Sequence, residues 1–198
     1  AKEIKAFIAS PGKWTDNPVK SMFTSQAEAD AKNAANKEKA EAAKAKAESS
    51  FAAAQAAEKL AADAGYNDAS LNTAAEAAIK DWTKAKADAF VAAVNSSDDK
   101  ETAFAELAPD YVSEDDKEDY EADPDASLHT GTVGSSLSYQ SFGKWLMDDS
   151  RANGDVGVVE SSSGYYAVML LNRYRDETAT ADIRHILIKA EVADADDP

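Results

Sequence analysis

The segment Ser25–Gly65, SQAEADAKNAANKEKAEAAKAKAESSFAAAQAAEKLAADAG, decides the fold more than any other part of the chain. It is rich in alanine and in charged residues of both signs, and it contains almost no large apolar side chains. Ser25 and Glu28 have the spacing of a capping box, and Gly65 is a typical helix terminator. The segment therefore predicts a helix of about 40 residues, roughly 60 Å long. This helix could pack through its alanines, project as an arm, or break into two helices near Ser49-Ser50.

The composition limits the classes of function. The 198 residues carry a formal net charge of −16, which argues against nucleic acid and against an anionic membrane surface as partners. The chain has no cysteine, so disulfides, thiolate metal sites and a cysteine nucleophile are excluded. No apolar run approaches the ~20 residues of a membrane span, and no signal peptide is recognisable. We therefore expect no membrane insertion in this chain, and nothing in it predicts a cofactor.

Two further helices are expected after the alanine-rich segment. The stretch 67–97 has apolar residues at helical spacing on one face, which indicates an amphipathic helix that ends at Asn95-Ser96-Ser97. The members of this face are Leu71, Ala75, Ala78, Ile79, Trp82, Ala89, Phe90, Ala93 and Val94, and we interpret the face as core rather than as a peptide groove. A short helix is predicted at Glu101–Tyr111. Residues 110–127 are expected to form an acidic, solvated loop, because they lack the spacing and the glycine of an EF-hand calcium site.

The C-terminal half predicts a small mixed unit. A Gly/Ser loop precedes a short helix around Phe142–Asp149, and strands are expected at 156–160 and 165–174. The tight turn SSSG between these strands favours a β-hairpin. Because the second strand is apolar on both faces in its middle, we expect it to be central in its sheet.

The end of the chain repeats its beginning. EIKAFIA (Glu3–Ala9) and DIRHILI (Asp182–Ile188) share an acid, an isoleucine, a base, one variable residue and three apolar residues. The match is only seven residues long, so chance remains an explanation for it. If the repeat is real, the chain holds one whole unit and the first strand of a second.

Several of these motifs resemble the parvulin-type peptidyl-prolyl isomerase family. DIRHILIK is similar to the family's opening strand, and FAELAPDYVSEDD (Phe104–Asp116) resembles its helix and the loop that follows. Gly154-Asp155-Val156 resembles the family's G-E-V, and Ser163-Gly164-Tyr165-Tyr166 resembles its S-G-x-H. The resemblance implies an α+β fold with a small antiparallel sheet, here elaborated by a long alanine-rich helical insertion at about residues 25–95.

The resemblance also implies a domain plan and a cellular role. Residues 1–177 would form a degenerate parvulin-like domain, and residues 178–198 a linker and the first strand of a second, truncated one. Tandem domains of this kind are similar to secreted foldases and periplasmic chaperones of bacteria. The resemblance therefore implies an extracytoplasmic folding factor that binds unfolded or proline-containing polypeptides.

The site implied by the resemblance is incomplete. Asp115 and Ser163 match family positions, but Ala6 and Tyr166 stand where the family has its two histidines. His185 retains the family histidine in the truncated second unit; without the resemblance, it would be interpreted as a structural histidine. The resemblance thus implies weak or absent isomerase activity. Residues that could line a substrate groove or simply pack are Tyr139, Phe142, Trp145 and Met147.

A second hypothesis is independent of the isomerase resemblance. The chain could be a non-enzymatic interaction domain in which the alanine-rich helices serve as an assembly arm. A dimer could form through this helix, or through the terminal strand, because an exposed apolar strand tends to pair with another.

Overall fold

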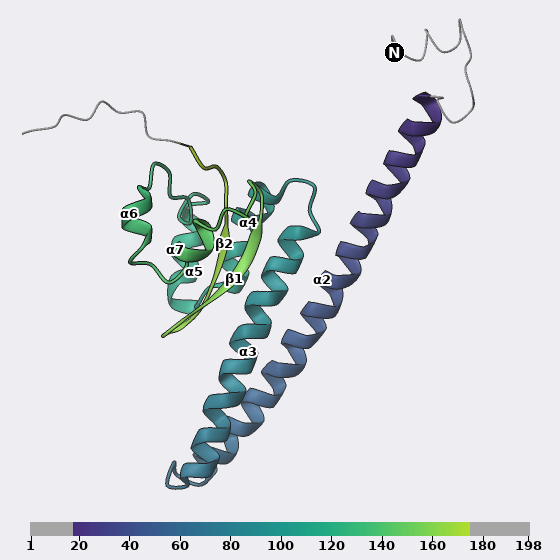
Figure 1. The fold of residues 1–198 in the computed structure, drawn as a ribbon. Coiled ribbons are helices and arrows are strands. Elements are labelled where there is room, and N and C mark those ends of the chain that lie inside the picture. The colour runs from purple at the N-terminus through teal and green to yellow at the C-terminus, as the bar shows by residue number, and fades with distance from the viewer. Residues whose placement is uncertain (1–17, 175–198) are drawn as a thin grey trace, which may run out of the picture.

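The computed structural model describes residues 18–174, with side chains from Gln26 onward. Two long helices, α2 (Pro18–Asp63) and α3 (Ala69–Asn95), form an antiparallel hairpin, and the remaining elements gather beside one end of it (Figure 1). The other elements are α4 (Lys100–Tyr111), α5 (Glu114–Ala122), α6 (Gly134–Leu137), α7 (Gly143–Leu146), β1 (Val156–Ser161) and β2 (Gly164–Met169). The predicted α+β class is confirmed, with helices dominating and a two-stranded antiparallel sheet.

Helix α2 is continuous over 46 residues. It passes through Ser49-Ser50 without a break, so the alternative of two helices is wrong. The helix begins before Ser25, so the capping-box spacing of Ser25 and Glu28 does not mark its start. It ends as predicted at Gly65, which has a φ of +61° and donates its N–H to the Ala62 carbonyl at 2.8 Å.

A seam of small residues joins α2 to α3. Apart from Glu58, the residues of α2 from Gln26 onward that are buried or half-buried alternate in steps of four and three, which is the heptad spacing of a helix that follows a partner. This seam consists of Asn36, Ala40, Ala43, Ala47, Ser50, Ala54, Ala57 and Ala61. Small side chains allow the two backbones to approach closely. At the open end of the hairpin, the Asn36 side-chain amide donates to the Asn95 carbonyl at 3.1 Å.

Helix α3 is buried on two sides. Ala75, Ala85 and Ala89 are almost fully buried along the hairpin, while Phe90 and Val94 belong to a separate core with Ala108 of α4. Partly buried side chains of α4, β1 and β2 pack around that core, among them Phe104, Leu107, Tyr111, Val156 and Ala167. The prediction that Phe90 is core is therefore confirmed, and α3 is the element that connects the hairpin to the compact part.

The acidic segment is partly helical rather than a loop, so the prediction for residues 110–127 is wrong. Ser113 caps α5 by accepting the Asp116 N–H at 3.3 Å. Three acidic residues follow in the first turn, where the partial positive charge of the helix terminus favours them. The loop was predicted from the density of acidic residues, and this prediction did not take into account Ser113 as the N-cap of a helix. The helix expected at Phe142–Asp149 is also shorter, a single turn from Gly143 to Leu146.

The predicted β-hairpin is confirmed. The strands pair in the register Val156↔Met169 to Ser161↔Gly164, and within the described residues they form the whole sheet. The second strand ends at Met169 rather than Tyr174, and among the described residues it pairs with β1 alone, so its expected central place in the sheet is not seen there. The segments 3–9 and 182–188, with Ala6 and His185, lie outside the described residues, as does the proposed domain boundary at 177/178.

No helix between residues 18 and 174 combines the length and the apolar character needed to cross a membrane. Helix α2 is long enough, but charged residues occur throughout it.

Candidate functional site

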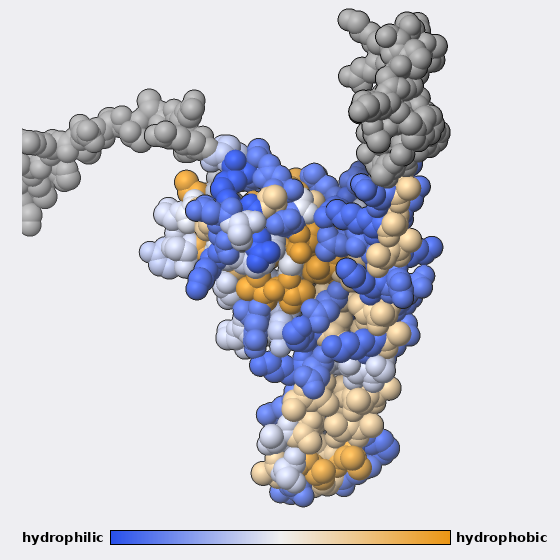
Figure 2. Space-filling model, turned by 45° about the vertical axis from the view of Figure 1, so that its right-hand side comes forward, coloured by the Kyte–Doolittle hydropathy of each residue, from blue (hydrophilic) through white to orange (hydrophobic). Residues whose placement is uncertain are grey.

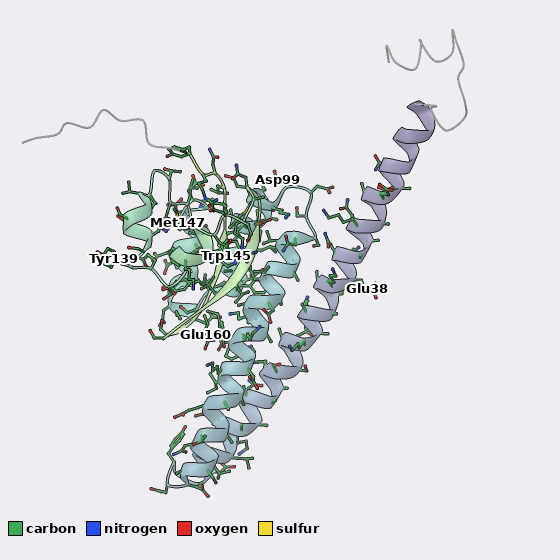
Figure 3. All side chains as sticks on the ribbon, viewed as in Figure 1. Glu38, Asp99, Tyr139, Trp145, Met147 and Glu160 are labelled. Atoms are coloured by element: carbon green, nitrogen blue, oxygen red, sulfur yellow. The ribbon has the colours of Figure 1, made fainter. Side chains whose placement is uncertain are left out.

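One candidate site is a shallow cleft of about 370 Å³ between α7 and β1. Its lining residues are Ser141, Lys144, Trp145, Asp148, Val158, Val159 and Glu160. Successive side chains of a strand point to opposite faces of the sheet. A cleft that touches three consecutive residues of β1 therefore runs along the edge of the strand, on the side that β2 does not cover. Figure 3 shows Trp145 and Glu160 near this part of the molecule.

Trp145 is held tightly against β1. A Cβ added to Gly157 would lie 2.6 Å from the Trp145 ring, so only glycine allows the indole to approach the strand this closely. The Arg151 guanidinium lies 4.7 Å from the centroid of the same ring, which is a cation–π distance. The cleft thus has one rigid aromatic wall.

Helix α7, although only one turn long, is fixed at both ends. A Cβ on Gly143 would lie 1.7 Å from the Leu137 carbonyl oxygen, so the start of α7 packs directly on the end of α6. Arg173 donates to the carbonyls of Leu146 and Asp148 beyond the other end. These contacts hold the helical wall of the cleft in place.

The structure brings together only some of the residues predicted as a site. The rings of Phe142 and Tyr166 meet edge to face, with centroids 5.2 Å apart, on the sheet face that carries Gly157. Tyr139 is 90% exposed, and Met147 is half exposed beside Gly134 (Figure 3). Of the four residues proposed as a groove, Trp145 lines the cleft and Phe142 packs next to it.

The polar residues carried over from the isomerase resemblance are separate. Asp115 lies exposed in the first turn of α5, and Ser163 lies in the turn of the hairpin, where its N–H donates to Ser161 Oγ at 3.3 Å. Within residues 26–174, no hydrogen bond joins Asp115, Ser163 and Tyr166. These three residues therefore form no connected polar network.

Other polar groups have structural roles. Asp99 caps α4, and hydrogen bonds from Thr102 hold its pKa below the usual range of a carboxyl. Burial lowers the pKa of Lys86, whose ammonium donates to the Val112 carbonyl at 3.1 Å. In the part of the chain that the structure describes, no group of three histidine, aspartate or glutamate side chains is arranged to hold a metal ion.

The sequence alone did not indicate the polar residues of the cleft, which are Ser141, Lys144, Asp148 and Glu160. A signal was present in the strand VGVVE, because an isolated glycine inside a strand often marks a place where another group approaches the backbone. Gly157 predicts such an approach, but it does not say which residue makes it.

Comparison with known proteins gives one informative similarity. The chain is 48% identical over 81 residues to a protein of Nitratidesulfovibrio vulgaris (strain Hildenborough) described as "UPF0324 membrane protein". The match covers 41% of this chain but only 14% of that protein, so the chain spans a small part of the relative's length. No family model matches the chain, and no solved structure matches it.

The interpretation as a parvulin-type isomerase, foldase or chaperone is wrong, because the similarity found is to a membrane protein of another family. The physical reason for the error lies in the motifs. Gly154-Asp155-Val156 is a turn entering a strand, and Ser163-Gly164 belongs to a tight hairpin turn, so both occur wherever a hairpin has this geometry. The resemblance came from local turn chemistry.

Proposed function

We propose that this chain is a non-enzymatic interaction module of a membrane-associated protein, and that the α2/α3 hairpin is its assembly arm. One observation carries the proposal: the distal part of the hairpin exposes large apolar side chains. Leu60 is 57% exposed, Tyr66 56%, Phe51 41% and Ile79 39%. Figure 2 shows apolar atoms at the tip of the hairpin, away from the compact part.

The arm has the geometry of a projecting element. Helix α2 has 46 residues, which corresponds to roughly 69 Å at the rise of an α-helix. The turn that joins α2 to α3 lies far from the sheet and from α4 to α7 (Figure 1). The continuous small-residue seam makes the two helices one unit, so the tip is presented at a defined place.

The exposed side chains favour a protein partner. Single exposed apolar residues are common on protein surfaces. Here, however, four large ones fall within the α2/α3 hairpin between residues 51 and 79, and the Phe51 ring packs against Trp82 at a tilt of 45° with a centroid distance of 4.9 Å. A concentration of this kind is typical of an interaction surface. The partner in this proposal is a second copy of the chain, whose tip offers the same apolar side chains.

We further propose that the module lies outside the membrane, on its extracytoplasmic side. The relative is described as a membrane protein, and no helix of the described residues is suited to span a bilayer. A net charge of −16 is repelled by the anionic lipids of the cytoplasmic leaflet, which supports the opposite side. Protease accessibility of the native protein in intact spheroplasts tests this point, and complete protection until lysis would contradict it.

Sedimentation equilibrium of the whole chain tests the arm. We expect concentration-dependent self-association that strengthens with salt, because salt screens the repulsion between two acidic chains. The variant Leu60→Glu/Ile79→Glu should associate at least tenfold more weakly. Ala42→Glu/Ala45→Glu is the matched control, because it adds the same charges at exposed positions of α2 away from the tip. A chain that stays monomeric at every concentration and salt, or a control as weak as the tip variant, would contradict the proposal.

A further inference from the structure

The free edge of β1 carries unpaired backbone groups. Leu170 donates its N–H to the Asp155 carbonyl at 3.0 Å, so these two residues form a hydrogen-bonded pair across the hairpin. Hydrogen-bonded and non-bonded pairs alternate along an antiparallel ladder. With the register of Val156↔Met169, Gly157 and Val159 therefore bond to β2, whereas Val158 and Glu160 direct their N–H and C=O groups to the opposite side.

The outward N–H and C=O groups of Val158 and Glu160 face the cleft. Val158 and Glu160 both line it, and Trp145 closes it on the side of α7. Among the described residues, no backbone hydrogen bond from outside the hairpin reaches Val158 or Glu160. A strand edge of this kind is a template for an extended segment, and a two-stranded hairpin gains stability from a third strand.

A suitable segment follows closely in the sequence after the last described residues, which lie near the cleft. Arg173 is fixed on the carbonyls of Leu146 and Asp148, and Asp148 lines the cleft. The chain continues past Tyr174, and six residues later comes the stretch ADIRHILIKA (181–190). Six residues can span up to about 20 Å. A segment tethered this closely has an effective concentration of order millimolar at the edge.

The composition of the segment fits the cleft. Ile183, Ile186 and Ile188 are β-branched residues, which are favoured in strands. Arg184 and Lys189 make residues 181–190 net positive, in a chain whose net charge is −16. Asp148 and Glu160 contribute carboxylates to the cleft, which Lys144 also lines, and the Glu160 carboxylate pairs with Lys80 at 2.7 Å.

We propose that Ala181–Ala190 of the same chain adds to the free edge of β1 as an extended strand, pairing with the backbone of Val158 and Glu160 beside Trp145. The β-hairpin of β1 and β2 thereby becomes a three-stranded sheet in which β1 is central. The inference is independent of the proposed assembly arm, because it involves the opposite part of the molecule.

Amide hydrogen exchange of the whole chain by NMR tests this inference. We expect the Val158 and Glu160 amides to exchange at least tenfold more slowly in the natural chain than in Ile186→Pro, because proline removes a donor and fixes the backbone in the middle of the added strand. Asp194→Pro, outside the segment, is the matched control and should retain the protection. The Gly157 and Val159 amides bond to β2 and should stay protected in all three proteins. Their protection shows that the β-hairpin of β1 and β2 is still folded.

Two results would overturn the inference. The first is equal exchange of the Val158 and Glu160 amides in the natural chain and in Ile186→Pro, with Gly157 and Val159 still protected. The second is protection that disappears on dilution, which would assign the strand to a second molecule. Fluorescence gives an independent readout of Trp145 in a chain whose other tryptophans, Trp14 and Trp82, are replaced by phenylalanine. The added strand would shield the Trp145 indole, so Ile186→Pro in this background should shift the emission to longer wavelength.

Discussion

The α2/α3 hairpin and the compact part around Phe90 are held together in different ways. Along the hairpin the most buried residues are alanines, such as Ala54, Ala61 and Ala75. In the compact part, Phe90 packs edge to face against Phe104 and Tyr111, at centroid distances of 4.8 and 5.2 Å. The first region gains stability from many small contacts at short range, and the second from a few large apolar surfaces.

Helix α3 shows both kinds of packing within one turn. Ala89 and Phe90 are neighbours in the sequence, and both are almost fully buried, but only Phe90 belongs to the aromatic core. The two regions should therefore respond oppositely to changes in side-chain size. The core should be sensitive to a loss of volume, and the seam to a gain.

The largest effect is expected in the core. Phe90→Ala should lower the free energy of unfolding by about 3–5 kcal/mol, because it removes a buried ring and leaves a cavity next to Phe104 and Tyr111. Urea unfolding followed by circular dichroism measures the change. Leu60→Ala is the control, because Leu60 is 57% exposed and its truncation should cost about 0.5 kcal/mol or less. Equal losses in the two variants would contradict the division into core and surface.

An intermediate effect is expected in the seam. Ala54→Leu should destabilise the chain by about 1–3 kcal/mol, because Ala54 is 4% exposed and a larger side chain would force the helices apart. Ala52→Leu places the same side chain on the exposed outer side of α2 and should change stability by about 0.5 kcal/mol or less. The same urea titration compares them. If Ala54→Leu were neutral, the seam would be looser than the structure shows.

The two regions also differ in how well the sequence predicted them. The hairpin helices follow from local signals, since alanine content, the glycine at position 65 and the apolar spacing of α3 all act over a few residues. The hairpin of β1 and β2 was likewise predicted from its turn. What local signals could not give is the choice of partner: the periodicity of α3 did not show that its alanines face α2 while Phe90 and Val94 face α4.

The candidate site was predicted less well, for a related reason. Trp145 and Phe142 were predicted either to line a substrate groove or simply to pack. The cleft exists only because α7 lies against Gly157 and is held by Arg173. These contacts join residues that are 12 and 27 positions apart. Asp115 and Ser163 were chosen through a family resemblance based on short turns, and the structure does not connect them.

The smallest effect concerns the caps of one helix in each region. Asp68 caps α3 at the tip of the hairpin, and Asp99 caps α4 in the compact part. Hydrogen bonds from Ser70 lower the pKa of Asp68, and those from Thr102 lower the pKa of Asp99. A folded-state pKa below the ordinary value of 3.8 means that the folded chain binds fewer protons than the unfolded chain. This contribution to stability is present above that value and is lost as the pH falls through the folded pKa.

The urea midpoint should therefore fall as the pH is lowered below about 3.8, and more steeply in the natural chain than in Asp68→Asn/Asp99→Asn. Asparagine can still accept the backbone N–H bonds of both caps through its Oδ1 but does not titrate, so the double variant removes the pH dependence while keeping these bonds. Glu106→Gln, which changes an exposed acid that caps no helix, should keep the natural slope. Both capping carboxylates are exposed to solvent, which screens their charge. We therefore expect this effect on stability to be smaller than those of Phe90→Ala and Ala54→Leu. The single variants then show whether the cap at the tip of the α2/α3 hairpin or the cap in the compact part is lost first as the pH falls. If the urea midpoint had the same slope against pH in the natural chain and in the double variant, neither cap would contribute.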